Sequence, residues 1–115
     1  MIKTLETLKK NSEFQNVYQN GKSLANKYLV MYILGNSLEK NRIGISVSKK
    51  VGNSVVRHRL TRLIKEIFRL NTDNLEKKLD IVIIVRVNAK GKTYKELESA
   101  FLHLTKMHRI LKEMV

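Results

Sequence analysis

The chain has 115 residues and a formal net charge of +13, with neither cysteine nor proline. This length is typical of one domain, and we expect residues 1–115 to form a single domain. The lack of cysteine excludes disulfides, thiolate nucleophiles and cysteine-based zinc sites. The net charge makes the folded chain a polycation, and a folded polycation needs a polyanionic partner. The longest apolar run, Ile81 to Val85, is too short to span a bilayer and no signal-peptide pattern is present, so we expect no membrane partner and a cytoplasmic protein.

The spacing near the N-terminus predicts a helix over residues 12–20. Asn11 or Ser12 can cap it, Gln15 stands at capping-box spacing from Ser12, and Gly21 can end it. An apolar set recurs at i, i+3 and i+4, which places its members on one face: Phe14, Val17 and Tyr18. Two interpretations of the aromatics stay open, namely core packing and an edge on which nucleic-acid bases stack.

Residues 23–34, SLANKYLVMYIL, have the composition of one long strand or of two short strands broken at Asn26 and Lys27. If residues 27–34 form a strand, alternate side chains share a face, which groups Tyr28, Val30 and Tyr32 against Leu29, Met31 and Ile33. Residues 42–48 alternate in the same way. They predict a half-buried strand that is joined to its predecessor by an antiparallel hairpin.

The strongest helical periodicity follows, with Asn53 or Ser54 as the expected cap. An apolar stripe must pack on the sheet: Val56, Leu60, Leu63, Ile64, Ile67 and Phe68. Between residues 49 and 69 the single acid is Glu66, and it stands against seven basic residues: Lys49, Lys50, Arg57, Arg59, Arg62, Lys65 and Arg69. Because Arg57 and Arg59 lie roughly 160° apart on a helix, they cannot bind the same phosphate.

Residues 80–87, DIVIIVRV, predict a strand that is buried on both faces and runs parallel to the 42–48 strand through a helical crossover. Arg86 near its end is either a residue of the sheet rim or a charge directed into a ligand groove. Thr93 and Glu96 have capping-box spacing and open a third helix, whose apolar spacing continues through Leu97, Phe101, Leu104, His108 and Leu111. The predicted order is helix, two or three strands, helix, strand and helix, which is a mixed α/β (α+β) arrangement.

The sequence predicts no catalytic residue and no metal site in the protein. Asp73 and Asp80 are the only aspartates, and no carboxylate cluster has the spacing of a two-metal nuclease. His103 and His108 are five residues apart, not on one helical face as in a zinc site, and His58 stands among arginines. What remains is binding of RNA or DNA, and a helix-turn-helix DNA reader would need a short helix where the sequence predicts a strand.

The segment SVSKKVGNSVVRHRLTRLIKE resembles the motif S-x-S-K-K-x-G-N-A-V-x-R-N-R-x-K-R-x-I-R of bacterial ribonuclease P protein subunits. Upstream, LKKNSEFQNVYQNGKSLANKYLVMY resembles the aromatic helix and the G-x-S-x-A-N strand of that family. The resemblance implies an αβββαβα sandwich of the ribosomal protein S5 domain 2-like type with a four-stranded sheet. Residues 1–115 would then form a single RNA-binding domain. It also implies a cofactor of ribonuclease P that binds the catalytic RNA subunit and the 5′ leader of precursor tRNA, while Mg²⁺ on the RNA performs hydrolysis and the protein alone is inactive.

Carried over by position, the resemblance gives two sets of site residues. The contacts to the RNA subunit would be Lys49, Lys50, Asn53, Arg57, His58, Arg59, Arg62, Lys65 and Arg69. The leader would lie in a cleft between the sheet and the first helix, near Phe14, Tyr18, Ser23, Ala25, Asn26, Tyr32 and Arg86. His58 and Thr61 replace the Asn and Lys of the family motif, so we expect retained binding with an altered hydrogen-bond pattern and a weaker salt dependence.

Two rival functions share the charge and size of this chain. One is a ribosomal or ribosome-assembly protein, which co-purifying ribosomal RNA would indicate. The other is a nuclease that acts without an RNA subunit, in which replacing one carboxylate would abolish cleavage.

Overall fold

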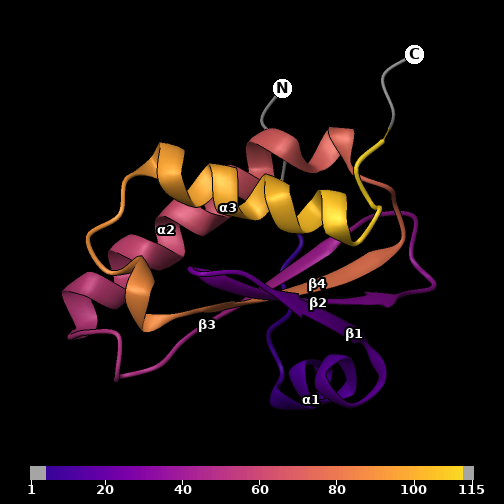
Figure 1. Ribbon diagram of the computed structural model, residues 1–115. Coiled ribbons are helices and arrows are strands. Elements are labelled where there is room, and N and C mark those ends of the chain that lie inside the picture. Colours follow the sequence, from indigo (N-terminus) through magenta and orange to yellow (C-terminus); the bar gives the residue numbers. More distant parts are fainter. Residues whose placement is uncertain (1–4, 113–115) are drawn as a thin grey trace.

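The computed structural model describes residues 5–112 and confirms the predicted order αβββαβα (Figure 1). The helices are α1 (Asn11–Asn20), α2 (Ser54–Asn71) and α3 (Tyr94–Met107). The strands are β1 (Lys22–Ala25), β2 (Leu29–Gly35), β3 (Arg42–Val47) and β4 (Leu79–Val85), with short 3₁₀ turns at Thr72–Asn74 and Val87–Ala89. No helix of the described residues is long and apolar enough to cross a membrane.

The sheet has the order β1-β2-β4-β3, in which β4 runs antiparallel to β2 and parallel to β3. The predicted parallel crossover from β3 through α2 to β4 is therefore confirmed. The predicted hairpin between β2 and β3 is wrong, because β4 lies between them. Both faces of β4 are buried, so β4 takes an inner position in the sheet and β3 lies at the edge. The segment before α1 covers this edge, because Ile43 exchanges backbone hydrogen bonds with Glu6 at 3.0 Å and Leu8 at 2.9 Å.

The break between β1 and β2 lies where the sequence predicts it, at Asn26. The Asn26 side-chain oxygen accepts hydrogen bonds from the backbone N–H groups of Tyr28 (3.2 Å) and Leu29 (3.0 Å), which fixes the turn. Within β2 the alternation is confirmed, but its extension to Tyr28 is wrong. Tyr28 precedes the strand and packs on the side of the sheet opposite to Tyr32.

Helices α2 and α3 cover one face of the sheet and α1 covers the other (Figure 1). The predicted stripe of α2 is confirmed, since Leu60, Ile64, Ile67 and Phe68 are all buried. They form one core with the α2-facing side chains of β4 and with the apolar face of α3. A second, smaller cluster joins α1 to the other face through Leu8, Val17 and Val82. The sheet thus separates two apolar layers.

The helix starts are fixed by side chains close in sequence. The predicted cap of α1 at Asn11 or Ser12 is wrong, because the helix begins at Asn11 after Lys10, and the Glu13 carboxylate accepts the N–H groups of Lys9 and Lys10. Gly21 ends it as predicted, and a Cβ there would lie 2.6 Å from the Val17 carbonyl oxygen.

The predicted caps of α2 and α3 are confirmed. The Asn53 side chain accepts the Val56 N–H at 3.0 Å, and Thr93 and Glu96 bond reciprocally. Helix α3 ends earlier than its apolar spacing predicts. Leu111 forms an isolated bridge with Leu75, and residues 113–115 lie outside the described residues.

An ion-pair network that the sequence does not predict ties α1 to the sheet. The Arg42 Nε and Nη2 atoms donate to both carboxylate oxygens of Asp80, at 2.8 and 2.7 Å, and Nη1 donates to Glu13 at 2.7 Å. Asn36 donates to Asp80 as well. The backbone N–H groups of Lys10 and Lys9, together with the Arg42 guanidinium, lower the pKa of Glu13. This network fixes α1 over the sheet.

Candidate nucleic-acid interface

One end of the domain gathers basic side chains from three connections and from the first turns of α2. The carboxyl ends of parallel strands β3 and β4 meet there, and the β1–β2 turn joins them because Leu29 pairs with Val85. Helices α2 and α3 both begin after these strands, so their positive N-terminal dipoles lie at the same end. We call this surface the basic end: Lys27, Lys49, Lys50, Arg57, Arg59, Arg86, Lys90 and Lys92. Such a surface attracts polyanions.

The two arginines of the R-x-R motif diverge, as the sequence predicts. Arg57 donates to the Gly52 carbonyl oxygen at 3.2 Å and lies beside β3, whereas Arg59 donates to the Lys92 carbonyl oxygen at 2.8 Å, toward α3. A groove of about 450 Å³ lies on the Arg57 side, and its lining residues are Ile45, Val47, Ser54, Arg57, His58, Thr61 and Lys65. The two arginines therefore lie on different parts of the basic end.

The other residues predicted to contact an RNA subunit follow the outer face of α2 and the turn before it. Five of these side chains are exposed to solvent: Lys49, Lys50, His58, Arg62 and Lys65. Asn53 is also exposed, but its side-chain oxygen caps α2, and Arg69 pairs with Glu66. Thr61, which departs from the family motif, bonds through Oγ1 to the Arg57 carbonyl oxygen at 2.9 Å.

The aromatics predicted to bind a leader do gather on the α1 face of the sheet. The rings of Tyr18 and Tyr32 meet edge to face with centroids 5.0 Å apart, and Phe14 lies 6.4 Å from Tyr18. Burial raises the pKa of Tyr18, and a hydrogen bond to Ser46 opposes that rise. Phe14 rests on Gly44, where a Cβ would lie 2.7 Å from its ring. All three rings are only half-buried, so they pack on the sheet and still present edges.

Ser23 and Ala25 continue this aromatic face onto β1. Ser23 pairs with Tyr32 and Ala25 with Val30, and directly opposed residues of an antiparallel pair point to the same side. Both are exposed, so the expected cleft is a half-exposed sheet face beside α1. We call it the aromatic face: Phe14, Tyr18, Ser23, Ala25 and Tyr32.

Asn26 and Arg86 do not join the aromatic face. Asn26 Nδ2 donates to the Ala100 carbonyl oxygen at 2.8 Å and lies 3.2 Å from His103 Nδ1, so its side chain points toward α3. Arg86 is exposed at the basic end and donates to the Asn26 carbonyl oxygen at 2.8 Å. The structure therefore places Arg86 at the rim of the sheet, the first of the two predicted alternatives.

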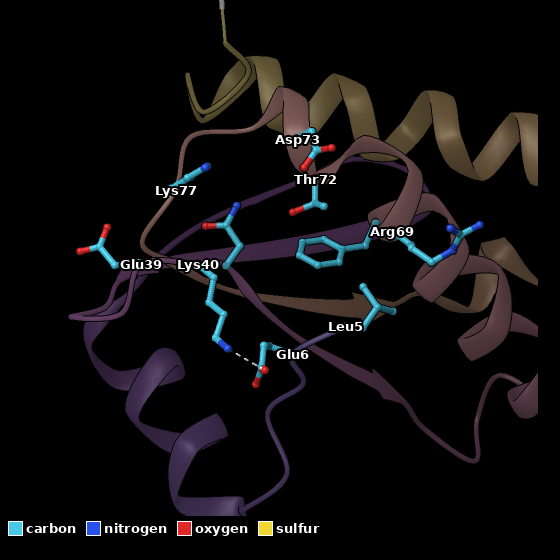
Figure 2. Close-up of a pocket in the computed structure, with 10 residues that line it drawn as sticks. Leu5, Glu6, Glu39, Lys40, Arg69, Thr72, Asp73 and Lys77 are labelled. Atoms are coloured by element: carbon cyan, nitrogen blue, oxygen red, sulfur yellow. Dashed lines mark hydrogen bonds and ion pairs between the residues drawn. The ribbon is translucent and has the colours of Figure 1, made fainter. Parts of the chain in front are cut away.

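A pocket of about 260 Å³ lies at the opposite end of the domain, beside the start of β3 (Figure 2). Leu5 and Phe68 supply apolar walls, and the charged lining residues carry both signs, with Lys40 and Glu6 paired at 2.7 Å. Mixed charge gives this pocket no strong field. It is therefore a poorer site for a polyanion than the basic end.

The histidines are dispersed. His58 and His103 are exposed, while half-buried His108 places Nε2 2.9 Å from the Met31 carbonyl oxygen, and burial lowers its pKa. In residues 5–112, no three His, Asp or Glu side chains come together at a spacing that would hold a metal ion.

Sequence reasoning missed part of the basic end. Lys27, Lys90 and Lys92 stand outside the 49–69 segment, and Tyr28 was predicted on the other face. The paired lysines around Gly91 are a signal in the sequence, but their approach to α2 and to the β1–β2 turn depends on the tertiary structure.

The fold and these surfaces define a class, a small mixed α/β domain with one strongly basic end and a separate face of aromatic side chains. The family model described as Ribonuclease P matches residues 2–109. A curated relative from Lachnoclostridium phytofermentans, named ribonuclease P protein component, is 60% identical over 106 residues, covering 92% of this chain and 91% of the relative.

Two solved structures have the same architecture. The RNase P protein of Staphylococcus aureus superposes with a TM-score of 0.87 and 34% identity over 95% of this chain and 100% of that one. The RNase P protein of Thermotoga maritima gives a TM-score of 0.82 and 32% identity over 89% of this chain and 96% of that one. The chain belongs to the ribonuclease P protein family.

Proposed function

We propose that this chain acts as the protein cofactor of ribonuclease P and promotes 5′ maturation of precursor tRNA by the holoenzyme. Membership of the family supports this role. The single structural observation that carries it is the separation of two surfaces, because the basic end and the aromatic face offer different chemistry to two different RNA molecules.

The basic end and the outer face of α2 are proposed to bind the RNA subunit. Exposed lysines and arginines neutralise phosphates and release counterions, which stabilises binding to a folded RNA without reading its sequence. Arg57 and Arg59 would hold separate phosphates, because one lies beside β3 and the other toward α3.

The aromatic face is proposed to hold the single-stranded 5′ leader of precursor tRNA. Half-buried rings offer edges and faces on which unpaired bases stack with little sequence preference. Arg42 holds α1 in place and so keeps Tyr18 beside Tyr32. In this proposal hydrolysis belongs to magnesium ions on the RNA, and the protein positions the substrate.

The test is reconstitution with a bacterial ribonuclease P RNA and a precursor tRNA at low magnesium concentration. We expect the purified chain to accelerate 5′ cleavage by the RNA and to cleave nothing alone. No acceleration would refute the proposal. Cleavage without the RNA would establish the unaided nuclease, and selective recovery of ribosomal RNA with the chain would favour the ribosomal rival.

A further inference from the structure

Two lysine ammonium groups converge on one half-buried aromatic ring at the basic end. Lys27 Nζ lies 5.8 Å and Lys92 Nζ 5.5 Å from the centroid of the Tyr28 ring. These distances allow cation–π attraction, which keeps both ammonium groups near the ring. Tyr28 packs partly against the core under α2 and α3, so the ring has a supported side and an exposed side.

Three segments far apart in the sequence fix this arrangement. The Arg86 N–H donates to the Tyr28 carbonyl oxygen at 2.9 Å, and the Arg86 guanidinium donates to Asn26. Asn26 in turn bonds to Ala100 of α3, while Arg59 of α2 holds the Lys92 carbonyl oxygen. The ring and its lysines are therefore mounted on hydrogen-bonded backbone and are not carried on a free loop.

The positive charge around Tyr28 is poorly neutralised. Lys27 has no ion-pair partner among residues 5–112. The Glu96 carboxylate lies 4.0 Å from Lys92, but its other oxygen accepts hydrogen bonds from Thr93 in the cap of α3. A cavity of about 230 Å³ adjoins the ring, and its lining residues are Asn26, Lys27, Tyr28, Glu96, Ser99, Ala100 and His103.

We propose that Lys27, Tyr28 and Lys92 form an additional contact for the ribonuclease P RNA subunit. An unpaired nucleotide stacks on the exposed side of Tyr28, and the two flexible ammonium groups bind the phosphates that flank it. The site rests on the proposed function. It belongs to the RNA subunit and not to the leader, because the sheet separates Tyr28 from the aromatic face and Arg59 joins it to the basic surface of α2.

The first test measures the affinity of the RNA subunit for the protein by fluorescence anisotropy over a range of salt concentrations. We expect the double variant Lys27→Gln/Lys92→Gln to lower the salt slope by roughly two phosphate contacts. The matched control Lys77→Gln/Lys112→Gln removes the same charge from the opposite end, where Lys77 lines the pocket of Figure 2 and the Lys112 N–H donates to the Asn74 carbonyl oxygen. This control should keep nearly the wild-type slope. Equal slopes for the two double variants would overturn the proposal.

The ring is tested separately. Tyr28→Leu should weaken binding of the RNA subunit about tenfold, whereas Tyr28→Phe retains the ring and should bind as wild type does. Because Tyr28 partly packs on the core, thermal unfolding checks that Tyr28→Leu is folded, and the lysine variants test the site without that complication. Equal affinity of folded Tyr28→Leu and Tyr28→Phe would refute the stacking contact.

Photo-crosslinking distinguishes the two RNA molecules. With p-benzoylphenylalanine in place of Tyr28, the reconstituted holoenzyme should give an adduct with the RNA subunit, and an adduct with the precursor alone would overturn the assignment. Failure of the proposed function is recognised separately, because wild-type protein would then neither bind the RNA subunit nor stimulate cleavage. If wild type does both and the variants bind equally well, only the Tyr28 site is refuted.

Discussion

Replacing Arg42 with methionine should destabilise the fold more than any other single loss of positive charge described above. The Arg42 guanidinium forms two hydrogen bonds to Asp80, whose side chain is only 4% exposed, and a third to Glu13 of α1. Removing one partner of a buried ion pair leaves the other charge without compensation, which costs about 3–5 kcal/mol. The Arg42 side chain is 23% exposed, so we expect the lower limit, about 3 kcal/mol.

The free energy of unfolding is measured by urea titration followed by circular dichroism, with a thermal scan alongside. A loss of about 3 kcal/mol should lower the unfolding temperature by about 10–15 °C in a domain of this size. Arg69→Met is the matched control, because it removes the same group from a solvent-exposed pair with Glu66 and should leave both midpoints near wild type. Similar small losses in the two variants would refute the reasoning.

Three further predictions concern binding and pH. Tyr18→Ala should weaken binding of leader-bearing precursor tRNA about tenfold and mature tRNA much less, because stacked leader bases lose their platform; equal losses would mean that Tyr18 only packs the fold. Arg57→Ala and Arg59→Ala should give different binding defects, because only Arg59 donates a hydrogen bond to the Lys92 backbone. If both variants lose the same affinity for the RNA subunit and keep their affinity for the precursor, that geometry is contradicted. Burial lowers the pKa of His108 in the folded protein below its ordinary value of 6.5, so between the folded and unfolded pKa values the unfolded chain binds more protons, and the free energy of unfolding should fall as pH drops through that range. His108→Gln should flatten this pH dependence when the free energy of unfolding is measured by urea titration at several pH values. An unchanged pH slope in the variant would contradict the prediction.

The candidate site was predictable where function follows from local pattern. The basic residues of α2 and the aromatics of α1 are found by helical spacing, because each set lies within one helix whose geometry the sequence fixes locally. The prediction that Tyr28 shares a face with Tyr32 was wrong, because it extended local strand geometry beyond the end of the strand. The alternation of Tyr28 with Tyr32 holds only inside a strand, and the strand begins one residue later, at Leu29.

Contacts between distant segments could not be predicted. Arg42 and Asp80 meet because β3 and β4 are parallel neighbours, and Lys92 reaches Tyr28 because the α3 start and the β1–β2 turn share one end of the sheet. Neither pair leaves a spacing signal in the sequence. Their chemistry depends on which strands are neighbours.

The sequence by itself determined the elements, their order, two of the three helix caps and the parallel crossover, since these depend on hydrophobic period and on capping residues close in the chain. Only the tertiary structure decided that β4 separates β2 from β3 and that the basic residues converge at one end. Strand pairing is a choice among distant partners with similar alternation, and burial on both faces of β4 resolves it only when the whole sheet packs. The charge was readable in the sequence, but its separation from the aromatic face is a property of the fold.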